Sequence, residues 1–122
     1  MKKNRSYSIR ARAQSFKYAF EGLAAAFRQQ PNMLIHLFAT IGVMILAIIF
    51  PPSRGEIIAL VIVTGFVWTA EIFNTVIEKI MDFISIERQP AIKTIKDLSA
   101  AAVLVAAMTA LITGGLVFIP KF

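Results

Sequence analysis

The stretch IIALVIVTGFVWTAEIFNTVIEKI at residues 57–80 is the most informative part of the sequence, because it begins as pure hydrocarbon and ends with carboxylate and amide side chains. A bilayer core is crossed by about 20 apolar residues of helix. An acidic side chain at that depth costs roughly 2.5–3.5 kcal/mol. We therefore expect residues 57–84 to form a membrane-spanning helix whose second half leaves the hydrocarbon or faces protein.

Two further apolar runs flank this helix. Residues 33–50, MLIHLFATIGVMILAIIF, make about 27 Å of helix, enough to cross the bilayer core. Residues 98–119 carry no charge and cross it comfortably. A turn rich in proline joins the first two spans, and we expect residues 86–95 to form a polar connection broken by Pro90. The prediction is an all-α integral membrane protein with three transmembrane helices in a single domain of 122 residues.

Composition supports the bilayer as the solvent of this chain. Apolar residues make up 57% of it, charged residues only 16%, and the mean hydropathy is +0.71. A soluble domain of this size keeps more charge on its surface. There are 13 Lys and Arg against 7 Asp and Glu, and the hydropathy favours an anionic membrane over nucleic acid as the partner of this charge. The absence of cysteine excludes disulfides and thiolate sites.

The segment before the first span has helical periodicity of another kind. Apolar side chains recur at steps of three and four along residues 8–30, with Arg10, Arg12 and Lys17 at other positions. This pattern predicts an amphipathic helix lying on the membrane surface. Residues 1–7 form a basic N-terminus.

The distribution of Lys and Arg predicts the topology. Residues 1–32 and the connection after residue 84 together carry ten of them, whereas the opposite side carries only Arg54 and Lys121. Because positively charged segments stay in the cytoplasm, the N-terminus and the second connection are expected there. For a bacterial chain we therefore expect location in the inner membrane. The acidic half of the middle span is then on the cytoplasmic side, where ATP is present.

The acidic half of the middle span is the main candidate for chemistry. At about 100° per residue, Glu71, Asn74, Glu78 and Asp82 fall within an arc of about 80°. Such a stripe can bind a divalent cation, abstract a proton, or do both. The alternatives are a buried polar seam that holds helices together, or a helix end emerging into water.

Two other features carry less specific signals. Lys96 and Asp97 precede the third span, where a lysine can neutralise developing phosphate charge, but the pair equally suits the start of a helix. His36 has no second histidine at ligand spacing, which favours a hydrogen-bonded or interfacial histidine over a metal ligand. Glycine-loop nucleotide motifs and HExxH are absent from the sequence.

Three stretches carry a resemblance to a known family. AEIFNTVIEKIMD at 70–82 and IKDLSAAAVLVAA at 95–107 closely resemble the small prokaryotic diacylglycerol kinases, a family that includes the undecaprenol kinases. SFKYAFEGL at 15–23 is a weaker match. Together these matches cover nearly the whole chain, and the first pattern is long and specific.

The resemblance implies a homotrimer whose active sites lie between neighbouring subunits at the cytoplasmic face. The implied reaction moves the γ-phosphoryl of ATP, with Mg²⁺, to the primary hydroxyl of a membrane lipid. By position, Glu71 matches the general base, and Asn74 and Arg12 are expected to contact the lipid substrate. Glu78 matches a metal ligand. The nucleotide contacts implied are Tyr18, Glu87, Gln89, Lys96 and Asp97.

One departure concerns the metal. The family often has a glutamate at the end of the surface helix, where this chain has Gln30, which offers a carbonyl oxygen without the charge. We retain Gln30 as a candidate ligand. Ala100 stands where some members carry serine near the lipid. The Pro90-containing connection and the run IKTIKDLSAAAVL resemble the undecaprenol branch more than the diacylglycerol branch.

Two other functions compete with a lipid kinase. The stripe of Glu71, Asn74 and Glu78 can serve as an intramembrane ion site in a small cation-transport subunit. The chain can also be a membrane scaffold without turnover. Ion flux that is insensitive to ATP indicates a transport subunit. A Glu71→Gln variant that keeps every measurable property of the wild type indicates a scaffold.

Overall fold

The computed structural model describes residues 8–122, and within them every regular element is a helix. The expected basic segment 1–7 lies outside the described residues. Three helices are long and apolar enough to cross a membrane, which confirms the predicted all-α membrane fold. The elements in chain order are α1 (Ile9–Gln29), α2 (Pro31–Ile49), α3 (Arg54–Ile84), α4 (Pro90–Phe118) and a short 3₁₀ turn (Ile119–Lys121).

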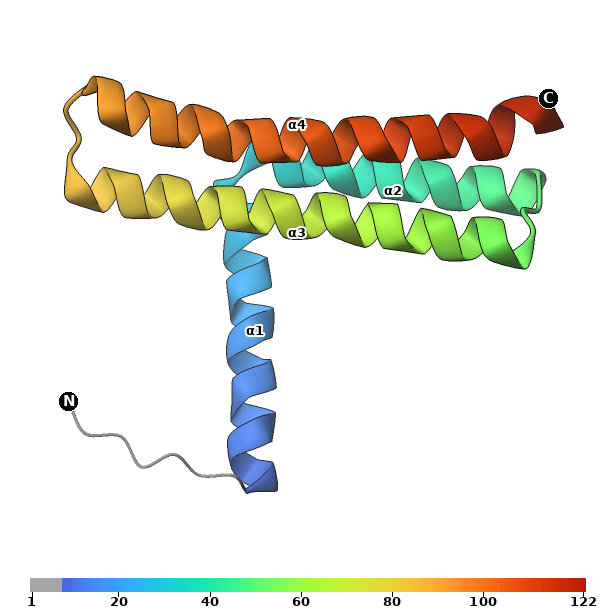
Figure 1. Ribbon diagram of the computed structural model, residues 1–122. Coiled ribbons are helices and arrows are strands. Elements are labelled where there is room, and N and C mark those ends of the chain that lie inside the picture. Colours follow the sequence, from blue (N-terminus) through green and yellow to red (C-terminus); the bar gives the residue numbers. More distant parts are fainter. Residues whose placement is uncertain (1–7) are drawn as a thin grey trace.

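The three long helices lie side by side, and α1 leaves them at a steep angle (Figure 1). The most extensive contact joins α3 to α4. Helix α2 is the shortest of the three, with 19 residues or about 28 Å of rise, close to the thickness of a hydrocarbon core. Helices α3 and α4 extend beyond the start of α2, so their connection at 85–89 lies well past the junction of α1 with the bundle (Figure 1).

Prolines set the starts of two helices. Pro31 and Pro90 both occupy the first turn, where a helix needs no backbone N–H and the fixed φ of proline suits the helical conformation. The expectation of a polar connection through residues 86–95 is therefore wrong from Pro90 onward. Helix α4 begins at Pro90 instead of residue 98, because this proline starts a helix and does not break one.

A capping box starts α3. The Ser53 hydroxyl accepts from the Glu56 amide at 3.2 Å, while the Glu56 carboxylate accepts from the Ser53 amide at 2.8 Å. Lys121 donates to the same carboxylate at 3.0 Å and so joins the C-terminal turn to the start of α3. These contacts hold the end of the bundle that lies opposite the α3–α4 connection.

We expect Ser53→Ala to lower the free energy of unfolding by about 1 kcal/mol, because the variant loses the side-chain acceptor at the helix start. The measurement is reversible denaturation in detergent micelles. Ser8→Ala, at the cap of α1, is the matched control. Because α1 makes few contacts with the bundle, loss of this cap should leave the free energy of unfolding of the bundle unchanged. An unchanged Ser53→Ala variant would contradict the stabilising role of this cap.

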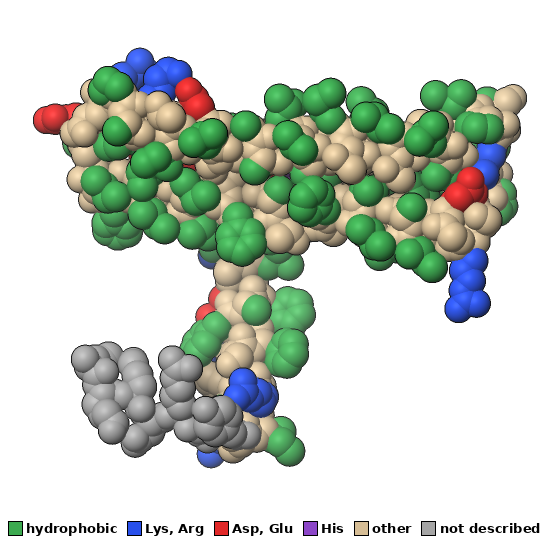
Figure 2. Space-filling view, in the orientation of Figure 1, with side chains coloured by type: hydrophobic (Ala, Val, Ile, Leu, Met, Phe, Trp, Pro, Cys, Tyr) green, Lys and Arg blue, Asp and Glu red, His purple; other side chains and the backbone are tan. Residues whose placement is uncertain are grey.

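Little of the apolar surface is buried within one chain. A small core of Leu60, Val117 and Phe118 lies where α3 and α4 face the end of α2. In contrast, Ile48 and Leu111 remain 78% and 76% exposed. Figure 2 shows hydrophobic side chains along the bundle and charged ones gathered towards its two ends. An apolar surface of this extent requires lipid or other apolar chains around it.

Trp68 joins three helices at the point where α1 meets the bundle. Its indole N–H donates to the Thr40 hydroxyl of α2 at 2.9 Å, and its ring lies edge-on to Phe27 of α1 with centroids 5.6 Å apart. Thr40 in turn donates to the His36 carbonyl at 2.7 Å. The junction therefore fixes the level of α1 on α3 about one turn from Glu71.

Candidate active site

Glu71 is fully buried in the helical bundle, with an exposed fraction of 0%. Its backbone carbonyl accepts from the Thr75 hydroxyl at 2.9 Å, a contact within one turn of α3. Burial of a carboxylate among apolar helices is costly unless hydrogen bonds satisfy it. The polar contacts of Glu71 therefore determine whether its carboxylate can remain buried.

The amide of Asn74 lies between two carboxylates. Its Nδ2 donates to Glu71 Oε2 at 3.3 Å and to Glu78 Oε2 at 3.2 Å. Ser99 of α4 donates to Asn74 Oδ1 at 2.6 Å, and this contact orients the amide with its N–H groups towards the acids. The structure thus brings together three of the four residues predicted from the stripe on α3, and α4 adds a serine to them. The fourth residue, Asp82, contacts Lys96 instead.

His36 supplies the other contact of Glu71. Its Nε2 lies 3.1 Å from Glu71 Oε1, across the interface of α2 and α3. The sequence favoured a hydrogen-bonded histidine here over a metal ligand, and the structure gives it a hydrogen bond. The sequence did not identify Glu71 as the partner of His36, because the two residues lie on different helices and no spacing relates them. Ser99 was missed for the same reason.

A second, more open group lies at the far end of α3 and α4. Lys96 Nζ contacts Asp82 Oδ1 at 2.7 Å, and Lys93 Nζ contacts Asp97 Oδ2 at 2.6 Å. Because α4 begins at Pro90, Lys96 and Asp97 lie two turns inside the helix, and the suggestion that they start it is wrong. A pocket of about 660 Å³ adjoins these ion pairs, with Glu87 and Gln89 of the connection also in its wall.

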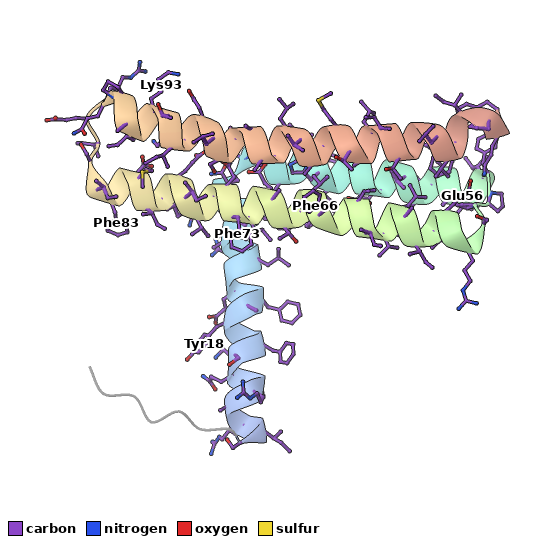
Figure 3. All side chains as sticks on the ribbon, in the orientation of Figure 1. Tyr18, Glu56, Phe66, Phe73, Phe83 and Lys93 are labelled. Carbon is purple, nitrogen blue, oxygen red and sulfur yellow. The ribbon has the colours of Figure 1, made fainter. Side chains whose placement is uncertain are left out.

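Three predicted residues lie elsewhere in the chain. Tyr18 and Arg12 are on α1, and Figure 3 shows Tyr18 well away from the bundle. Tyr18 accepts a hydrogen bond from Gln14 at 3.2 Å. Gln30 occupies the joint between α1 and α2, and the described residues include no hydrogen bond between it and Glu78. A single chain therefore does not bring these three to the Asn74 cluster.

The arrangement combines a candidate base with a separate charged pocket at the end of the bundle. Glu71 is a carboxylate shielded from water, and charge interactions are strong in such a place. About three turns further along α3, at Asp82, the ion pairs Asp82–Lys96 and Lys93–Asp97 border an open pocket. The part of the chain in residues 8–122 has no cluster of three His, Cys, Asp or Glu side chains that could hold a metal alone.

Comparison with known proteins shows the family of this chain. The profile described as prokaryotic diacylglycerol kinase matches residues 17–118, which include all of α2, α3 and α4 and the C-terminal part of α1. The chain belongs to the prokaryotic diacylglycerol kinase family. Membership confirms the class expected from the sequence, that of the membrane lipid kinases.

Relatives in this family carry two different names. A diacylglycerol kinase of Synechocystis sp. is 33% identical over 107 residues, which are 87% of this chain and 61% of that protein. The undecaprenol kinase of Bacillus subtilis is 33% identical over 107 residues, 88% of this chain and 87% of the relative. A diacylglycerol kinase of Pseudomonas aeruginosa is 32% identical over 89 residues, 73% of this chain and 72% of the relative. Equal identity to relatives of both names gives no choice between the two lipids.

Proposed function

We propose that this member of the family transfers the γ-phosphoryl of ATP, with Mg²⁺, to the primary hydroxyl of a membrane lipid, with undecaprenol favoured over diacylglycerol. The observation that carries the proposal is the buried Glu71, held on one oxygen by His36 and on the other by Asn74. Such a carboxylate serves as the base for a lipid hydroxyl, which does not ionise at neutral pH on its own.

The chemistry has to occur where lipid and nucleotide meet. In this proposal α1 lies on the cytoplasmic face of the inner membrane, supported by its steep angle to the bundle (Figure 1) and by the basic residues it carries. Glu71, about one turn from the α1 junction, then lies at the level of the lipid head groups. Asp82 and Lys96, further along, lie in the cytoplasm.

The residues near Lys96 are proposed to hold the nucleotide. Lys96 would neutralise phosphate charge as the phosphoryl group moves, and Asp97, Glu87 and Gln89 would contact the rest of ATP. All four border the same pocket. Tyr18, Arg12 and Gln30 lie outside this group within one chain, which supports a homotrimer in which α1 of a neighbouring subunit completes the site.

The donor set fits Mg²⁺ held mainly by ATP. Magnesium in kinases takes one or two carboxylates and completes its shell with phosphates and water. Glu78 is half-buried and has one oxygen, Oε1, outside the contact with Asn74. Glu78 would therefore hold the ion, with Gln30 as a candidate second ligand. When bound, the ion neutralises charge on the transferred phosphoryl group.

The direct test compares lipid acceptors. Purified protein in mixed micelles is given magnesium, ATP labelled at the γ-phosphate, and either undecaprenol or diacylglycerol. We expect labelled lipid phosphate from at least one lipid, and a higher kcat/KM with undecaprenol. Absence of labelled product with both lipids would refute the kinase, and equal kcat/KM would refute the preference. The transport alternative is examined in parallel by measuring ion flux across liposomes that contain the protein. Flux that ATP does not change would support a transport subunit.

We expect Glu78→Gln to raise the magnesium concentration needed for half-maximal activity by about 10–100-fold, the loss typical when support for a metal site is removed. Saturating magnesium should restore much of the rate, because the base remains intact. The measurement is a magnesium titration at fixed ATP. Glu56→Gln makes the same chemical change at the opposite end of α3 and should leave the titration unchanged. An unshifted curve for Glu78→Gln would exclude it as a ligand.

A further inference from the structure

The carboxylate of Glu71 has no open route to the membrane in this chain. Its side chain is 0% exposed, and His36 and Asn74 each occupy one of its two oxygens. A lipid hydroxyl has to approach from the apolar interior of the bundle or from the bilayer. The question is which side chain such a hydroxyl meets first.

His36 borders the space from which a lipid would come. A cavity of about 490 Å³ lies between α2, α3 and α4, and its wall is mostly apolar, with Val43, Val67 and Leu111 among the lining residues. His36, Thr40 and Trp68 line it as well, whereas Glu71 does not. The His36 side chain keeps 13% of its surface exposed. A lipid hydroxyl in this cavity therefore meets the imidazole before it can meet the carboxylate.

The two ring nitrogens of His36 have different surroundings. Nε2 contacts Glu71, and a carboxylate that is to act as a base is ionised and only accepts hydrogen bonds, so in this role Nε2 carries the proton. This tautomer leaves Nδ1 as a proton acceptor. Within residues 8–122 Nδ1 has no hydrogen-bond partner, and no buried polar side-chain atom in that range lacks one. Nδ1 is therefore accessible from outside the packed interior.

We propose that His36 relays the proton from the lipid hydroxyl to Glu71, an inference that rests on the proposed kinase function. The hydroxyl O–H bond breaks and its proton binds Nδ1 of His36. The proton on Nε2 passes to Glu71 Oε1, so the ring ends neutral and Glu71 holds the proton. The lipid oxygen bonds to the γ-phosphorus as the bond from that phosphorus to ADP breaks. Glu71 remains the base, and it acts through the imidazole.

The surrounding contacts hold the relay in place. Thr40 donates to the His36 carbonyl at 2.7 Å and accepts from Trp68 at 2.9 Å, which fixes the turn of α2 that carries the ring. Asn74 fixes the other oxygen of Glu71. A ring with an acceptor nitrogen towards substrate and a donor nitrogen towards a carboxylate also activates hydroxyl groups in hydrolases, where the ring keeps the proton, whereas in this proposal the proton passes on to Glu71.

The test begins with His36→Gln, because the glutamine amide can still donate to Glu71 but cannot accept a proton and pass one on. We expect kcat for lipid phosphorylation to fall about 100-fold or more, with KM for ATP unchanged. Retention of the wild-type kcat would overturn the relay. Wild-type protein that phosphorylates neither lipid would instead refute the proposed function, so the two failures are distinguishable.

Chemical rescue separates a relay from a structural role. His36→Ala leaves space beside Glu71, and added imidazole is expected to raise its lipid phosphorylation at least tenfold. Thr40→Ala opens a space one turn along α2 without removing a ring nitrogen, and its activity should not respond to imidazole. Glu71→Gln should not respond either, because it lacks the final acceptor. A His36→Ala variant that imidazole does not activate would overturn the proposal.

Discussion

Glu71→Gln is expected to lower lipid phosphorylation by about 10²–10⁴-fold, the range typical for loss of a general base. Glutamine has nearly the same shape and can keep a hydrogen bond to the amide of Asn74 or the ring of His36. It cannot take up a proton. The loss should therefore appear in kcat, while KM for ATP stays close to the wild-type value. The measurement is transfer of labelled γ-phosphate to lipid under saturating magnesium.

Two controls keep this result interpretable. Glu56→Gln changes a carboxylate to an amide in the same helix but at the opposite end of the bundle, where Lys121 and Ser53 are its partners. We expect it to keep the wild-type kcat. The oligomeric state of both variants is compared in micelles, because a buried polar change can disturb packing. Wild-type turnover by Glu71→Gln would show that the carboxylate does not serve as the base.

The second large effect is expected for Lys96→Met, which keeps the length of the side chain and removes its charge. Kinases stabilise the moving phosphoryl group with fixed positive charge, and loss of one such group lowers kcat by about 10²–10³-fold. In the free protein Lys96 contacts Asp82 at 2.7 Å, so the side chain already points along the pocket wall between α3 and α4. A rise in KM for ATP should accompany the fall in kcat.

Lys79→Met is the matched control for this variant. Lys79 is exposed on α3 near the same end of the bundle and does not line the pocket. The same loss of one positive charge should leave both kcat and KM for ATP unchanged. If Lys79→Met and Lys96→Met impaired turnover equally, general attraction of ATP by positive charge would explain the effect, and the specific role of Lys96 would be excluded.

The helices themselves could be predicted from local patterns. Apolar runs long enough to cross a bilayer predicted the three spans. Apolar side chains at steps of three and four residues predicted the helix that the structure shows as α1. The error at Pro90 has a local cause as well. A proline after a polar stretch can end one helix or occupy the first turn of the next, and only the path of the chain distinguishes them.

The candidate site could be predicted only where it lies on one helix. Glu71, Asn74 and Glu78 share a face of α3 because of their spacing, and the structure joins them through the Asn74 amide. His36 and Ser99 come from α2 and α4, and no rule of spacing relates them to α3. The Asp82–Lys96 pair also joins two helices and was not predicted.

Hydropathy and helical period are local properties of residues, and they were enough to predict a helical membrane protein and the acidic face of its middle span. The groups that surround the acids could be identified only from the packing of the helices. Packing of α2 and α4 on α3 closes Glu71 off from solvent and puts His36 between it and the cavity. That outcome depends on the rotation and level of three helices against each other, which side-chain packing sets.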